Sequence, residues 1–115
     1  MALDKPDVID AIGIETNSGH VILTLADSWD WLNEPEHLSA LQAKLNRYLD
    51  FIESGEILRV YQGALGRRLV IDVIHRHPIS RAGLTLLRRA AEVGSNLKVE
   101  IRHRHHAGAV TDSTS

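Results

Sequence analysis

Four histidines near the C-terminus have the type and spacing of a metal site. His75 and His77 end one apolar run, and His103 and His105 end another. Because alternate residues of a strand share a face, each His-x-His pair would project from one side of a sheet. If a crossover makes the two strands parallel neighbours, both pairs emerge at one edge, where clustered imidazoles suit zinc, copper or nickel. The competing interpretation is a set of surface histidines at strand ends.

Two carboxylates, Asp10 and Asp72, interrupt apolar strands and form a second candidate site. On adjacent strands they could approach each other and work as an acid–base pair. We favour the plainer interpretation that each lies on a solvent-facing or hydrogen-bonded side of the sheet.

An acidic loop that contains two tryptophans precedes the first predicted helix. Its carboxylates are Asp27, Asp30, Glu34 and Glu36. They could bind a hard cation, but a glycine-punctuated calcium loop is missing, and acidic residues at a helix N-terminus are favourable without a metal. We expect Trp29 and Trp31 to cover the core rather than to form a ligand platform.

Other chemistry finds little support in the chain. The sequence has no cysteine, which excludes disulfides, thiol nucleophiles and Cys-based metal sites. It contains no Gly-x-Ser-x-Gly, phosphate-loop, His-Glu-x-x-His or dinucleotide motif, so we expect no cofactor and consider a non-enzymatic role better supported than an enzyme. No signal or membrane segment is evident, and we expect a cytoplasmic protein.

The charge is unevenly distributed along the 115 residues. Residues 1–66 carry a net charge of −7 and residues 67–115 carry +5. We interpret this as two halves that attract each other within one fold. Nucleic-acid binding is disfavoured, because the basic half has no aromatic residue on which a base could stack. Its candidate contacts would be Arg67, Arg68, Arg76, Arg81, Arg88, Arg89, Arg102 and Arg104.

The first half predicts a hairpin followed by a helix. Val8–Ile14 and His20–Ala26 are apolar, β-branched runs separated by turn formers. Asn33, Pro35 and Glu36 form a capping box, and Ser54-Gly55 ends the helix.

The second half predicts another hairpin, from Glu56–Tyr61 and Arg67–His77, and then a helix that Ser80 caps and Gly94 ends. Leu97–His103 alternates between apolar and charged residues, which predicts a last strand.

The expected fold is α+β, in the order β-β-α-β-β-α-β. It has a mostly antiparallel five-stranded sheet with two helices on one face, and a ferredoxin-like arrangement is one version of it. Residues 1–106 form the single domain, and residues 107–115 a disordered tail.

Two motifs carry a family resemblance. VIDAIGI at residues 8–14 and LQxKLNxYLxFIESG at residues 41–55 resemble a family of small bacterial proteins classed as a domain of unknown function. The resemblance implies no activity and no site residues. Members of that family tend to have aromatic residues in place of His75 and His77, which argues against a family-wide role for these histidines.

Our leading hypothesis for function is a protein–protein interaction module that uses a sheet face or edge. Both faces of the strands are largely aliphatic, and two helices cover one face only. A homodimer is the simplest partner for the other face, and its interface residues would be Ile22, Thr24, Val70, Asp72 and Ile74. The alternatives are a monomer with one helix on each face, and a metal-binding or hydrolytic protein that uses the histidines.

Overall fold

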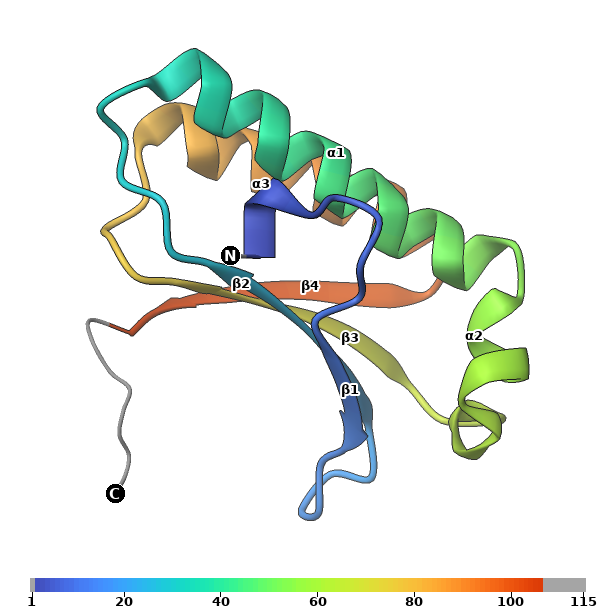
Figure 1. The fold of residues 1–115 in the computed structure, drawn as a ribbon. Helices are drawn as coiled ribbons and strands as arrows, with labels where there is room; N and C mark the ends of the chain where they lie inside the picture. Colours follow the sequence, from blue (N-terminus) through green and yellow to red (C-terminus); the bar gives the residue numbers. More distant parts are fainter. Residues whose placement is uncertain (1, 107–115) are drawn as a thin grey trace.

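The computed structural model describes residues 2–106, which form a mixed α+β fold with four strands and three α-helices (Figure 1). The strands are β1 (Ala11–Ile14), β2 (Val21–Asp27), β3 (Leu69–His75) and β4 (Val99–His105). The helices are α1 (Glu34–Glu53), α2 (Glu56–Val60) and α3 (Arg81–Asn96), with 3-10 turns η1 (Ala2–Asp4) and η2 (Gln62–Ala64). The predicted tail, residues 107–115, lies outside the described residues.

The sheet has the order β1-β2-β3-β4. β1 and β2 are antiparallel, as the predicted hairpin requires, whereas β2, β3 and β4 are parallel. Each parallel connection passes through a long helix, which provides the crossover that parallel neighbours need. The expected five-stranded, mostly antiparallel sheet is therefore wrong, and so is a ferredoxin-like arrangement.

The predicted strand at residues 56–61 is the helix α2 instead. Both edges of β3 are already paired, with β2 on one side and β4 on the other, so this segment has no neighbour for a hairpin. Ile57 is buried in the core, and the amide of Tyr61 bonds to its carbonyl at 2.7 Å. One buried side chain per turn suits a short helix better than an unpaired strand.

The predicted helix starts are confirmed. The side chain of Asn33 accepts a bond from the amide of Glu36 at 3.3 Å, and Ser80 accepts one from Gly83 at 3.0 Å. α1 ends at Glu53, and Gly55 follows with a φ of 82°. α3, however, continues past Gly94 to Asn96, so this glycine does not end the helix.

The helices α1 and α3 pack on the same side of the sheet, and none of the helices in residues 2–106 covers the other side (Figure 1). The core lies between these two layers, where Leu23 and Leu25 of β2 meet Ile71 and Val73 of β3. The predicted placement of two helices on one face is confirmed, and the alternative of one helix on each face is wrong. Within residues 2–106, no helix has the length and apolar composition needed to cross a membrane.

Candidate functional site

The sheet face opposite α1 and α3, called here the open face, contains the predicted interface residues. Odd-numbered positions of β2 and β3, such as Leu23 and Ile71, point into the core, so the even-numbered positions point to the open face. The predicted set occupies these even-numbered positions: Ile22, Thr24, Val70, Asp72 and Ile74.

These side chains are less exposed than an uncovered apolar face would be. Val70 is 1 % and Asp72 2 % exposed. Charged side chains of β4 lie over this surface, since Arg102 Nε is 3.5 Å from Asp72 Oδ1 and Arg104 Nε is 3.4 Å from Asp72 Oδ2. The open face is therefore a layer of aliphatic residues beneath a network of charged groups.

A hollow of about 390 Å³ lies on the open face. Ile22, Thr24 and Asp72 line it, together with residues 11–15 and the two arginines of β4. The open-face positions of β1 hold two small residues, Ala11 and Gly13. A Cβ atom added at Gly13 would meet no atom within 4 Å, so this part of the hollow is free space.

One oxygen of the hollow lacks a hydrogen bond. Oδ1 of Asp72 is buried and accepts no hydrogen bond within the described part of the chain. Arg102 Nε, at 3.5 Å, provides an ion pair only. A buried carboxylate oxygen without a donor is costly, so this atom favours a ligand or partner that brings one.

The second predicted site, the histidine set, comes together in part. β3 and β4 are parallel neighbours, as the metal hypothesis required. Nε2 of His75 lies 3.1 Å from Nδ1 of His103, and the ring of His105 stacks on His75 at a centroid distance of 5.8 Å. The His77 side chain instead lines a separate hollow beside Trp29. Within residues 2–106, no three His, Asp or Glu side chains converge as metal ligands.

Hydrogen bonds to backbone carbonyls place a proton on one ring nitrogen of His75 and on one of His105. Nδ1 of His75 lies 3.0 Å from the carbonyl of His77, and a carbonyl only accepts, so Nδ1 donates. Nε2 of His105 likewise donates to the carbonyl of Arg76 at 3.0 Å. Burial is the main cause that lowers the pKa of His75, which is 4 % exposed, and the neighbouring His103 and His105 lower it further.

The sequence interpretation missed a buried pair between Asp27 and His37. Nε2 of His37 lies 2.6 Å from Asp27 Oδ2, and Nδ1 lies 2.8 Å from the carbonyl of Asp30. The Trp31 ring stacks on the His37 ring at a centroid distance of 3.6 Å. Trp29 and Trp31 also pack against the core, which agrees with the prediction that the tryptophans cover it. His37 is 1 % exposed, so the pair stabilises the loop and is closed to substrates. One sequence signal could have identified His37 as buried: it lies on the apolar stripe of α1, four residues before Leu41.

Asp10 and Asp72 do not form an acid–base pair, because they lie on opposite faces of the sheet. Asp10 lies on the helix side, where Oδ1 accepts from Lys44 Nζ at 2.7 Å and Oδ2 from the Ala26 amide at 2.9 Å. The Asp10 amide donates to the hydroxyl of Tyr48 at 2.8 Å, and burial raises the pKa of this tyrosine. Asp10 therefore anchors the N-terminal segment to α1 and β2.

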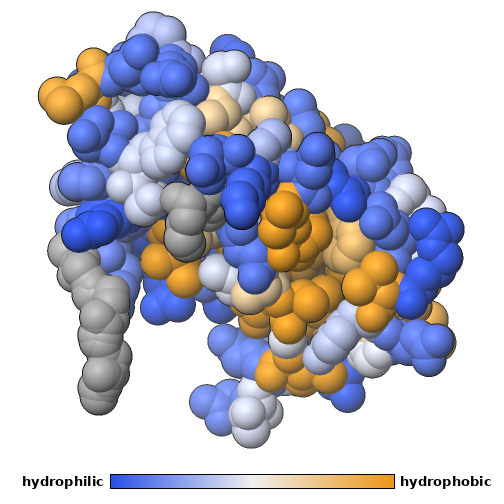
Figure 2. Space-filling model, in the orientation of Figure 1, coloured by the Kyte–Doolittle hydropathy of each residue, from blue (hydrophilic) through white to orange (hydrophobic). Residues whose placement is uncertain are grey.

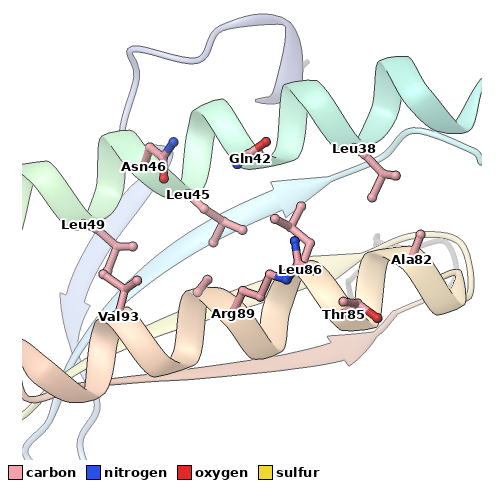
Figure 3. Close-up of a pocket in the computed structure, with 11 residues that line it drawn as sticks. Leu38, Gln42, Leu45, Asn46, Leu49, Ala82, Thr85, Leu86, Arg89 and Val93 are labelled. Carbon is pink, nitrogen blue, oxygen red and sulfur yellow. The ribbon is translucent and has the colours of Figure 1, made fainter.

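A groove of about 490 Å³ separates α1 from α3 on their outer side (Figure 3). Leucines of both helices form much of its lining, and Arg89 of α3 points along it. Other hydrophobic side chains gather over β1 and α2 (Figure 2), where Ile14, Leu58 and Val60 are exposed. Both surfaces are apolar, but among the described residues neither contains a buried polar atom without a hydrogen-bond partner.

Comparison with known proteins identifies a family, but no activity is described for that family. No curated protein and no solved structure matches the chain. Residues 1–107 match a family described as a family of unknown function, DUF6572. This confirms the resemblance to a family of unknown function, and because the match covers nearly the whole sequence, the chain belongs to the DUF6572 family.

Proposed function

We propose that this chain is a protein-interaction module whose open face binds a second copy of the same chain. The observation that carries the proposal is the buried oxygen without a hydrogen bond on Asp72, a residue that lines a hollow on the side of the sheet left uncovered by the helices of residues 2–106. In a fold of one sheet layer and one helix layer, the helices cover only one side of the sheet. A second subunit is the common means of covering the other side.

The charges of the open face favour a second copy over nucleic acid. The ion pairs of this face join three basic and three acidic side chains: Arg68, Arg102, Arg104, Glu15, Asp72 and Glu100. A phosphate backbone would select a uniformly basic face. A twofold interface instead requires a surface that is complementary to itself, and mixed charges around aliphatic residues meet this requirement.

The hollow above Gly13 has room for a side chain of the second copy. Asp72 lines the same hollow, so a donor group that reached its buried Oδ1 would supply the hydrogen bond that this atom lacks and would remove a penalty of about 1–3 kcal/mol. The proposed contact therefore combines burial of Ile22 and Ile74 with satisfaction of a buried acceptor.

Sedimentation equilibrium at micromolar concentration tests the proposal. We expect a wild-type dimer, and monomers for Ile74→Asp and for Gly13→Trp, because a Cβ atom at Gly13 meets open space and the indole would occupy the hollow that the second copy needs. The matched control is Leu32→Asp, at a 93 % exposed apolar residue in the loop before α1, which should remain dimeric. A monomeric wild type, or a dimer that both open-face variants leave intact, would contradict the proposal.

A further inference from the structure

We propose that His75 and His103 form a binding site for a divalent transition metal, at the edge of the sheet where β3 and β4 end. The site is independent of the proposed dimer, because both histidines occupy odd-numbered positions, on the helix side of the sheet. His75 closes β3, and His103 lies beside it near the end of β4. Because β3 and β4 are parallel, their carboxyl ends lie at the same edge of the sheet.

The distance between the two ring nitrogens matches a shared metal ion. Zn–N bonds of about 2.0–2.1 Å that meet at roughly 95–110° place their nitrogens about 3.0–3.4 Å apart. Nε2 of His75 and Nδ1 of His103 are 3.1 Å apart. The two nitrogens thus form a hydrogen bond at the spacing of neighbouring metal ligands, and an ion bound by both would replace the proton of this bond.

The tautomer of His75 is the one that a metal requires. Its Nδ1 donates to the His77 carbonyl at 3.0 Å, so the lone pair of the neutral ring is on Nε2, the atom that faces His103. A backbone carbonyl behind the ligating imidazole is the usual support of a metal-binding histidine. The buried position of His75, 4 % exposed, also holds the ring in place before an ion arrives.

The chain supplies two ligands and leaves the other positions open. Among residues 2–106 no third side chain converges on the pair, and His105 uses Nε2 to bond the Arg76 carbonyl. His103 is exposed, so an ion can enter from solvent and complete its coordination with water. Two imidazoles with open positions suit Cu²⁺, Ni²⁺ and Zn²⁺, with Cu²⁺ bound most tightly of the three.

The test is a calorimetric titration of the full chain, without a histidine tag, with Zn²⁺ and separately with Ni²⁺. We expect saturable binding of one ion, weakened by more than about tenfold in His103→Ala, which changes an exposed residue and should keep the fold. His106→Ala is the matched control, because it removes an exposed histidine three residues away and should bind like the wild type. Equal loss in both variants, or no loss in either, would overturn the proposal.

Imidazole nitrogen NMR of the wild type provides a readout that needs no variant. Zn²⁺ should shift the resonances of His75 Nε2 and His103 Nδ1, while Nδ1 of His75 keeps its proton. Shifts spread over all exposed histidines, with none at His75, would indicate non-specific surface binding and would also overturn the proposal.

Discussion

Glu15 and Arg102 contact each other across the open face, with Oε2 3.4 Å from Nη2. Glu15 directly follows β1 and Arg102 belongs to β4, and these are the two edge strands of the sheet. Two strands separate them in the sheet order, so the contact requires a twisted sheet and two side chains that extend over the hollow. The pair thereby links the acidic N-terminal half to the basic C-terminal half.

Charge reversal on the open face should weaken self-association more than it weakens the fold. Arg68 and Glu100, 3.6 Å apart and both exposed, form a surface pair, so Arg68→Glu should change the free energy of unfolding by less than about 1 kcal/mol. In the proposed dimer the same change upsets the charge balance of two copies, and we expect the dissociation constant to rise at least about tenfold. Urea unfolding and sedimentation measure the two effects.

The exchange Arg68→Glu/Glu100→Arg is the control for this prediction. It restores the charge balance of the face and should restore much of the lost association. A double variant as weak as the single one would mean that the two charges do not act through complementarity.

Removal of the His37 side chain should cost much more stability than removal of an exposed histidine. His37→Ala leaves the Asp27 carboxylate buried without its 2.6 Å partner and takes away the ring on which Trp31 stacks. Loss of one member of a buried pair typically costs about 3–5 kcal/mol. Urea unfolding should show this loss for His37→Ala and a change below about 0.5 kcal/mol for His106→Ala, which is exposed. A loss below about 1 kcal/mol for His37→Ala would contradict the structural role given to the pair.

Gly94 should be intolerant of a methyl group, whereas Gly13 should accept one. A Cβ atom at Gly94 would lie 2.8 Å from the backbone carbonyl of Val99, which cannot move without shifting β4. Gly94→Ala should therefore destabilise the protein by about 1–3 kcal/mol, despite the better helix propensity of alanine. Gly13→Ala meets open space and should be neutral or slightly stabilising. Thermal unfolding of the two variants under identical conditions measures the difference.

The parts of the fold that follow local rules were predictable from the sequence. The capping box at Asn33, the cap at Ser80 and the left-handed Gly55 depend on residues close in the chain. The period-two alternation of β2 and β3 also placed Ile22, Asp72 and Ile74 correctly on the open face. These signals need no knowledge of strand order.

The errors arose where distant segments compete for neighbours. The run from Glu56 to Tyr61 has strand composition, but it forms a helix because β3 is paired on both edges. Gly94 resembles a helix stop, yet its role is close contact with β4, which only the packed structure shows. The Asp27–His37 pair joins a strand end to a helix start ten residues later, and no motif marks it.

The charge asymmetry was only partly explained by attraction between the halves. Glu15–Arg102 joins them, but Lys44–Asp10 lies within the acidic half and Arg68–Glu100 within the basic half. The open face brings both signs together mainly because β4 carries alternating charged residues, and the neighbouring strand β3 carries Asp72.

His75 should make the stability of the metal-free protein depend on pH below about 6.5. Burial holds the pKa of the folded-state imidazole below its ordinary value of 6.5. Between the two values the unfolded chain binds more protons than the folded chain, so the free energy of unfolding rises with pH in this window. The stability that neutral His75 contributes is fully present above the unfolded-state pKa. It is lost as the pH falls through the lower folded-state pKa. Urea unfolding from about pH 7.5 to about pH 5.5, with a chelator present, should show this decline.

The variant His75→Gln isolates the titration of this residue, because its side-chain amide does not titrate in this range. Its stability should fall less steeply between these pH values than that of the wild type, and the difference between the two slopes belongs to His75. His106→Ala serves as the control for the loss of a histidine at an exposed position. If His75→Gln and the wild type lose stability in parallel, the buried imidazole does not titrate with folding, and the decline comes from other groups.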